Sequence, residues 1–356
     1  MTRAALAAAL VLAVAAAAPI AWIETRCVEA REPAAAAVRE AILPAADRRN
    51  PVDTWLTYPE WSIVHAYDDL AAVSRTRGES AFAYRASVAG YWRGLCATMR
   101  VASTRGEVTA DVRTMLHVIG TSFGAEMLVK GAWESTVGAA TEALRGPEPT
   151  REDVFAYAVA ADYAAFLRQT PWYAYPFGPT LARFWTEVPL ERGSIVRCLE
   201  RRVALTLEWS VKAVYAKALG ALAGLSPAAG SIRSVVRGLD ATDLAADPRI
   251  VVVERRPDGL VIVETPRYRA FTEVLAGLAG RGRDLVEIAG NDVILVTVHA
   301  PAGAPPLPGA EQRLAVPVQA RPGIERRAVD VRVDALAATL RGLSAAGMML
   351  EHVYDY

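Results

Sequence analysis

Residues 250–263 read Ile-Val-Val-Val-Glu-Arg-Arg-Pro-Asp-Gly-Leu-Val-Ile-Val. Two β-branched runs flank the turn signal Pro257-Asp258-Gly259, and this arrangement predicts a β-hairpin. A helix is predicted next, beginning at Pro266 and ending near Ala279. The stretch therefore marks the start of a domain in which strands and helices alternate.

The rest of the C-terminal region continues the same alternation. Strands are predicted at 284–288 and 293–298, near 314–318 and 328–333, and at 348–354, with a helix over 334–346. The order fits β-α-β-β-α-β with extra strands. We therefore expect a ferredoxin-like α/β sandwich over residues 241–356, its helices on one face of the sheet, which makes the chain α+β.

The middle of the chain carries apolar residues at helical spacing. Helices are predicted over about 58–75, 80–103, 109–145, 150–168 and 190–225. Thr57 and Glu60 match a capping box at the start of the first of these helices, and Pro59 suits its first turn. We expect an α-helical domain over residues 50–240.

The N-terminal region contains an uncharged run from Ala4 to Ile23. At about 1.5 Å rise per residue, a helix of this length just spans a bilayer core. We interpret residues 1–23 as a transmembrane anchor, with a cleaved signal peptide as the alternative, and residues 24–49 as a stalk or linker. The first interpretation predicts a single-pass inner (cytoplasmic) membrane protein with its bulk extracytoplasmic, and the second a periplasmic or secreted protein.

Composition limits the classes of function. Lys plus Arg and Asp plus Glu both number 39, so no basic field favours nucleic acid, while 53% of the residues are hydrophobic. A neutral, apolar chain suits a membrane surface or a complex. No GxGxxG, P-loop or HExxH motif occurs, and the four histidines lack ligand spacing, so we expect no metal and no cofactor.

The three cysteines are Cys27, Cys96 and Cys198. Outside the cytoplasm, Cys96 and Cys198 could form one disulfide. The other interpretation is that these two residues are buried thiols that pack as small hydrophobic side chains.

Residues 120–124, Gly-Thr-Ser-Phe-Gly, match the G-x-S-x-G pattern of a serine nucleophile elbow. In this hypothesis Ser122 is the nucleophile, His299 the base and Asp292 or Asp284 the acid. The same small residues also let two helices approach closely, and the predicted helical surroundings favour that interpretation.

An internal echo relates two predicted helices. Glu126 and Lys130 are followed by Trp133 and Gly138, and Glu208 and Lys212 are followed by Tyr215 and Gly220 at the same spacing. The echo is a coincidence between two amphipathic helices, or it marks a duplicated helical element whose two copies pack as a pair.

Aromatic residues gather in two segments, and we expect them to form the binding surface. The candidates are Trp55, Tyr58, Glu60 and Trp61 near the anchor, and Trp172, Tyr173, Tyr175, Phe177 and Trp185 in mid-chain. The alternative is that they fill the core of an alanine-rich bundle. His352 alternates with apolar neighbours, so it should face solvent or a partner.

These patterns predict a membrane-anchored, extracytoplasmic, non-enzymatic protein that binds a partner protein or an apolar ligand through its helical domain. A serine hydrolase centred on Ser122 is one alternative. An accessory subunit of a membrane redox or transport complex is another.

Overall fold

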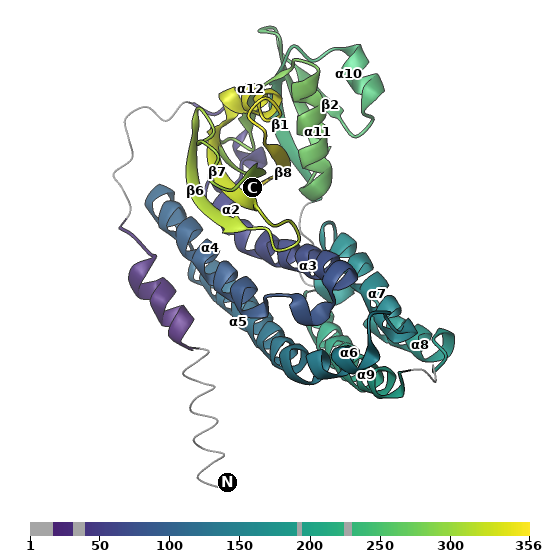
Figure 1. Cartoon of the computed structure of the whole chain (residues 1–356). Helices are drawn as coiled ribbons and strands as arrows, with labels where there is room; N and C mark the ends of the chain where they lie inside the picture. The colour runs from purple at the N-terminus through teal and green to yellow at the C-terminus, as the bar shows by residue number, and fades with distance from the viewer. Residues whose placement is uncertain (1–16, 31–39, 191–193, 224–229) are drawn as a thin grey trace.

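A computed structural model describes residues 17–30, 40–190, 194–223 and 230–356 (Figure 1). It combines helices with antiparallel sheets, so the α+β class is confirmed. Residues 17–26 are helical, but most of the proposed N-terminal span lies outside the described residues. Within the described residues, no helix is both long enough and apolar enough to cross a membrane.

The helical part follows the predicted boundaries closely. Its helices are α2 (Asp53–Leu56), α3 (Tyr58–Arg77), α4 (Tyr84–Arg105), α5 (Ala110–Trp133), α6 (Ala139–Arg145), α7 (Arg151–Leu167), α8 (Phe177–Glu187) and α9 (Ile195–Ala223), with 3-10 turns at Ala45–Asp47, Glu79–Ala81 and Trp172–Ala174. A π-helical turn, Glu134–Gly138, joins α5 to α6. Helix α8 was not predicted, because it begins inside residues 171–179, a stretch dense in prolines and aromatic residues.

Two helix starts show how local signals compare with the structure. At α7, Thr150 and Asp153 form a reciprocal capping box. The capping box predicted at Thr57 is wrong, because α2 leads directly into α3 and Thr57 is itself in a helical conformation. Its hydroxyl donates to the Asp53 carbonyl oxygen at 2.8 Å instead. Pro59 does lie in the first turn of α3, as expected.

The C-terminal part contains two four-stranded antiparallel sheets among the described residues. Sheet A has the order β2-β3-β1-β4 and sheet B the order β6-β7-β5-β8. The elements are β1 (Ser231–Arg237), α10 (Ala241–Ala246), β2 (Val251–Arg255), β3 (Leu260–Pro266), α11 (Tyr268–Gly280), β4 (Asp284–Ile288), β5 (Val293–Pro301), β6 (Ala310–Pro317), β7 (Ile324–Arg332), α12 (Val333–Gly342) and β8 (Met349–Val353).

The two sheets are copies of one arrangement. Each unit has three strands, a helix and a fourth strand, and the strand orders correspond one to one. The first unit has the short helix α10 in addition, between β1 and β2. The register shifts between Val235 and Val236 in the β1–β4 pair and between Thr297 and Val298 in the equivalent β5–β8 pair. The β2–β3 and β6–β7 pairs also share a shift at matching positions. Shared bulges indicate an internal duplication of this unit.

The single ferredoxin-like sheet predicted over residues 241–356 is wrong, because the strands form two sheets. The first unit, β1-α10-β2-β3-α11-β4, nevertheless has the β-α-β-β-α-β order of a ferredoxin-like fold, and all its strand pairs are antiparallel. This unit begins at Ser231, before the predicted boundary. The sequence analysis missed β1, because Ser231, Arg233 and Ser234 interrupt its apolar pattern. Without β1 the first unit looked incomplete, and its repetition in the second unit was hidden.

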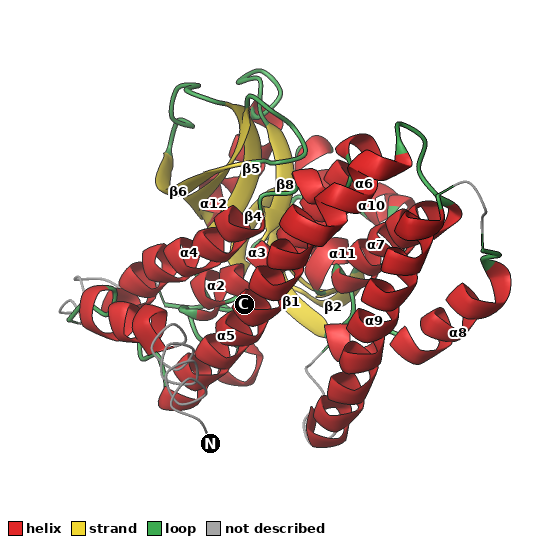
Figure 2. Cartoon of the chain, turned by 60° about the horizontal axis from the view of Figure 1, so that its bottom comes forward, coloured by secondary structure: helices red, strands yellow, loops and turns green. Residues whose placement is uncertain are grey.

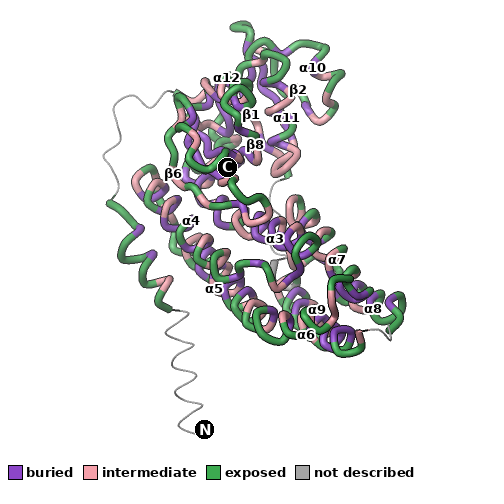
Figure 3. Tube along the Cα trace, in the orientation of Figure 1, coloured by how far each residue is buried: buried purple, intermediate pink, exposed green. Residues whose placement is uncertain are grey.

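The two units enclose a common apolar core. It contains Val236 and Val263 of sheet A, Phe271 of α11, and Val298 and Leu336 of the second unit. Helix α11 packs against α12, and α12 also lies along β4 of the other unit (Figure 2). The burial map shows this core between the sheets, above the helical part (Figure 3).

The opposite face of each sheet is covered by an N-terminal segment. On sheet A, Leu43 packs against Val235 and Ile262, and the backbone N–H groups of Ile42 and Leu43 donate to Glu287 at 2.6 and 2.9 Å. These residues, predicted to be part of a stalk, therefore lie on the sheet. Helices α2 and α3 cover sheet B, where the Trp55 Nε1 donates to Asp330 at 2.7 Å.

Candidate functional site

The two echoed helices pack as a pair. The Lys130 Nζ of α5 lies 2.7 Å from Glu208 of α9, and the Lys212 Nζ of α9 lies 2.7 Å from Glu126 of α5. The Ser122 and Tyr215 hydroxyls also approach to 3.5 Å, so residue numbers rise on one helix as they fall on the other. The helices are thus antiparallel, and the interpretation of the echo as two packed copies is supported by this reciprocal pairing.

The ion pairs continue into the bundle as a connected ladder. Lys130 also contacts Glu79 at 2.6 Å, and Arg201 contacts both Glu79 and Glu134 at 2.7 Å. Beyond them, Arg197 pairs with Asp153 at 2.8 Å, and both side chains are almost fully buried. We call these side chains, with Glu126, Glu200, Glu208 and Lys212, the ion ladder.

The charged groups of the ion ladder shift the pKa values of their neighbours. Burial raises the pKa of Glu208, but Lys130 and Lys212 outweigh it and hold that pKa well below its ordinary value. Burial, reinforced by the charge of Glu79, raises the pKa of Glu134 to about 7 against the opposing pull of Arg201. One carboxylate oxygen of Glu134, Oε2, has no hydrogen-bond partner among the described residues. The ladder therefore contains one carboxyl group that takes up a proton near neutral pH.

The outward sides of the same two helices are apolar. We call this surface the α5–α9 face, and its half-exposed members are Val118, Leu128 and Val129 of α5 and Val196, Leu199, Val203, Leu207, Val211 and Val214 of α9. The α9 residues recur at intervals of three or four, so they form a single stripe. In Figure 1, α5 and α9 lie on the side of the helical part away from the sheets.

The α5–α9 pair is thus inverted relative to an ordinary soluble bundle. From Val203 to Ala216 of α9 the charged residues are Glu208 and Lys212, and both point inward to ion pairs. From Thr114 to Trp133 of α5 they are Glu126 and Lys130, which are paired in the same way. Water-soluble monomers rarely expose such contiguous apolar patches, so this face calls for an apolar neighbour.

The N-terminal helix is fastened to α4 and to the start of α5. Cys27 forms a disulfide with Cys96, and Glu24 contacts Arg113 at 2.9 Å and His117 at 2.8 Å. The disulfide proposed between Cys96 and Cys198 is therefore wrong. Cys198 is instead buried on α9.

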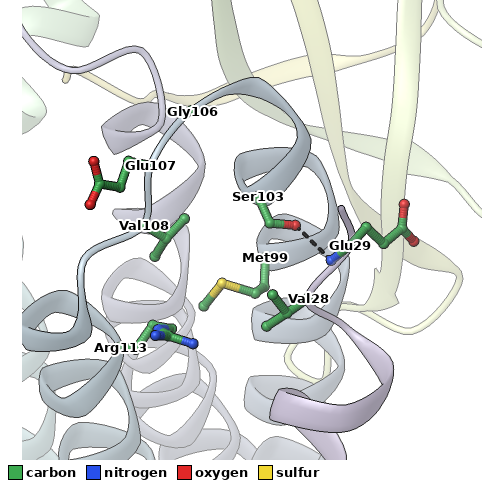
Figure 4. Close-up of a pocket in the computed structure, with 8 residues that line it drawn as sticks. All are labelled: Val28, Glu29, Met99, Ser103, Gly106, Glu107, Val108 and Arg113. Atoms are coloured by element: carbon green, nitrogen blue, oxygen red, sulfur yellow. Dashed lines mark hydrogen bonds between the residues drawn. The ribbon is translucent and has the colours of Figure 1, made fainter. Parts of the chain in front are cut away.

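A shallow cleft of about 350 Å³ opens beside this junction (Figure 4). Val28 and Met99 line it, and Ser103 accepts a hydrogen bond from the Glu29 N–H at 3.0 Å. The cleft has three charged residues at its rim, Glu29, Glu107 and Arg113, and their side chains do not point toward a common centre (Figure 4). The cleft supports no particular ligand.

The predicted aromatic surface is mostly interior. Trp55, Tyr58, Trp61, Tyr175 and Phe177 are buried, and Trp172 and Tyr173 are half-buried against the same core. Trp185 and Glu60 are exposed. Tyr175 and Phe177 pack beside Tyr163 of α7, so for them the alternative interpretation, a filled helical core, is the correct one. Trp55, Tyr58 and Trp61 are instead buried between the helices and sheet B or the C-terminal residues that follow it.

His352 also departs from its prediction. It is buried and stacks on Trp61 of α3, with ring centroids 3.6 Å apart. Burial lowers its pKa to about 3, so the ring is neutral at physiological pH. The alternating pattern placed His352 on the outer face of β8 correctly, but α3 covers that face.

The structure does not assemble the hypothetical serine triad. Ser122 lies inside the continuous helix α5 and donates to the Val118 carbonyl oxygen at 2.7 Å, so no nucleophile elbow exists there. His299 lies on β5 with Glu351 at 2.8 Å. Asp292 precedes that strand and lies about 23 Å from His299 along the chain, at roughly 3.3 Å per residue. Asp284 begins β4 of the other sheet.

The close-packing interpretation holds for Gly120, where a Cβ would lie 2.2 Å from the Tyr91 ring of α4. At Gly124 a Cβ would be in ordinary contact with Val88, at 3.5 Å. Outside the pattern, a Cβ at Gly131 would lie 2.6 Å from Tyr84. Helix α5 thus approaches α4 closely along the side opposite its apolar outward residues.

Comparison of the chain with protein-family models, with curated proteins and with solved structures finds no match. The site therefore rests on its own geometry. Sequence reasoning missed the α5–α9 face, although the echoed Glu-Lys pairs signalled that charges on the two helices meet. The sequence does not show whether those charged side chains point into the bundle or out of it.

Proposed function

We propose that the protein is a non-enzymatic, extracytoplasmic protein held at a membrane by its N-terminal segment, and that its α5–α9 face binds an apolar neighbour. The single observation that supports this is the inversion of the α5–α9 pair, with charges inside and aliphatic side chains outside. The binding surface is thus different from the aromatic segments first expected.

The energetics favour an occupied face. Fully burying a valine or leucine side chain is worth about 1.5–3 kcal/mol. Val203, Leu207, Val211 and Val214 are 60–71% exposed, so covering each would contribute on the order of 1 kcal/mol. Together these four residues would contribute about 4 kcal/mol toward an apolar neighbour, before α5 is counted and before the cost of association.

The compartment is supported by the disulfide. Cys27 and Cys96 are joined close to the end of the proposed anchor, and disulfides persist mainly in oxidising environments. The proposed orientation therefore places the two units and the helical part outside the cytoplasm.

Photo-crosslinking in native membranes tests the face. A benzophenone amino acid replaces Leu207 of the face or, as a matched control, Val251, which is similarly exposed on β2. We expect an adduct, to lipid or to protein, at Leu207 and none at Val251. The absence of any adduct at Leu207 would contradict the proposal.

A C-terminal reporter enzyme that is active only in an oxidising compartment tests the orientation. We expect activity, together with an oxidised Cys27–Cys96 pair in non-reducing electrophoresis. An inactive reporter and two reduced thiols would place the chain on the other side of the membrane.

A further inference from the structure

We propose that the neighbour of the α5–α9 face is the acyl-chain region of the lipid bilayer in which the N-terminal segment is anchored. This inference rests on the proposed function, and it identifies lipid acyl chains as the apolar neighbour that covers the face. It is argued from the length, the direction and the composition of the face.

The face is long and continuous. The part of α5 from Thr114 to Trp133 is about 30 Å long at 1.5 Å per residue. No described helix can cross a membrane. In this inference the face contacts the acyl chains from one side, as interfacial amphipathic helices do. The matching part of α9, Val203 to Ala216, covers about 20 Å. Over these lengths the charged side chains point inward and are paired, as ionisable groups at membrane depth are. Only the outward side of each helix needs to be apolar for such contact.

The direction of the face matches the anchor. Glu24 near the end of the N-terminal helix is held by Arg113 and His117 at the start of α5. From there α5 runs back in the direction from which the N-terminal helix comes (Figure 1). If the residues before Glu24 cross a membrane, α5 descends from its contact with Glu24 toward that same membrane.

The composition of the face favours lipid over protein. The centres of protein interfaces are enriched in Tyr, Trp, Met and Arg. The stripe on α9 consists of valine and leucine, and its arginines, Arg197 and Arg201, are buried in the ion ladder. The Tyr and Met side chains on this side of the helices are Tyr215 and Met115, which are less exposed than most of the aliphatic residues. Trp185 is half-exposed beside α9 and donates to Thr206 at 3.1 Å, and a partly exposed tryptophan suits a membrane–water interface.

Depth-dependent quenching tests the inference on the full chain. Variants Leu207→Cys and Val129→Cys, with Val251→Cys as the control, are made in a Cys198→Ala background and labelled with an NBD fluorophore. Each is reconstituted in phosphatidylcholine–phosphatidylglycerol vesicles with or without brominated acyl chains. We expect bromine to reduce the emission of the two face labels by about half or more and to leave the Val251 label unchanged. Unaltered circular dichroism shows that each variant is folded.

The outcomes separate the two proposals. If the chain floats with the vesicles but the face labels behave like Val251, the lipid inference is overturned. A crosslink from Leu207 to protein in native membranes would then leave the proposed function intact with a different occupant. A full chain that does not float with vesicles at all would overturn both.

Discussion

The paired sheets keep aliphatic side chains inside, whereas the α5–α9 pair keeps charged side chains inside and aliphatic ones outside. Between the sheets, residues such as Val236, Phe271 and Leu336 are fully buried. Between the helices, Arg201 and Glu134 are buried to the same extent. The helical part also has an apolar core, to which Phe123 of α5 and Trp209 of α9 belong, so the ion ladder is a buried charged network that stands beside it.

The difference indicates which environment the outer surface of each part contacts. An aliphatic core is stabilised by removing apolar surface from water, so its outer side must be polar. A buried ion ladder gains little or nothing over an aliphatic core, because desolvation offsets the attraction between its charges. A buried ion ladder is therefore expected where the outer side of the helices has to be apolar, because the charged residues can then lie only on the inner side.

The largest expected effect comes from breaking the ladder. In Arg201→Met, Glu79, Glu134 and Glu200 lose their shared cation. Removing one partner of a buried ion pair lowers the free energy of unfolding by about 3–5 kcal/mol. We expect this variant to lie at the upper end of that range, because three carboxylates lose their partner. Urea unfolding in detergent measures the loss. The matched control Arg183→Met, from an exposed pair with Glu187, should change the free energy of unfolding by less than about 0.5 kcal/mol. Equal losses in both variants would contradict the ladder's role.

The next effect comes from the aliphatic core. Phe271→Ala removes a fully buried ring between the sheets and should lower the free energy of unfolding by about 3 kcal/mol or more. The same urea titration at pH 5 and pH 8 should give the same loss, since the ring contacts aliphatic neighbours. A loss that changed strongly with pH would show that this core and the ion ladder are not independent.

A smaller effect is the pH dependence of the ladder. Glu134 has its pKa raised from an ordinary 4.5 to about 7, so the folded state binds a proton that the unfolded state has already released. Stability should therefore fall as pH rises from about 5 to about 7, by on the order of 2 kcal/mol, and then level off. Thermal unfolding at several pH values measures this, and Glu134→Gln should remove the decline. An unchanged decline in Glu134→Gln would assign it to another group.

The smallest effect concerns the outward residues. Leu207→Ser on α9 and Val251→Ser on β2 should each change the free energy of unfolding in detergent by less than about 0.5 kcal/mol, as surface substitutions do. In vesicles, the same Leu207→Ser should weaken the quenching of a label at Val129, whereas Val251→Ser should not. A large loss of stability in detergent would mean that Leu207 belongs to the core.

Much of the fold followed from local patterns. The long helices α3, α4, α5, α7 and α9 have apolar residues at helical spacing, and every strand from β2 to β8 was anticipated. Strand β1 was missed because polar residues interrupt it, and α8 because its prolines and aromatic residues indicated a loop. The pairing of the strands could not be predicted, since one set of antiparallel strands can form one sheet or two.

The candidate site was harder to predict from the sequence than the fold. The aromatic residues Trp55, Tyr58 and Trp61 were selected by residue type, yet α2 and α3 turn them toward sheet B. The disulfide also escaped prediction, because three cysteines allow three pairings and spacing alone does not choose Cys27 with Cys96. The echoed Glu-Lys pairs were the one sequence signal that led to the site.

The sequence by itself determined where most of the helices and strands lie and that α5 and α9 each have a charged and an aliphatic side, because these properties repeat with the local period of the backbone. The tertiary structure alone decided which side turns inward. That choice depends on partners distant in the chain: Lys130 and Lys212 point into the bundle because Glu208 and Glu126 meet them there. The valines and leucines are left outside as a consequence.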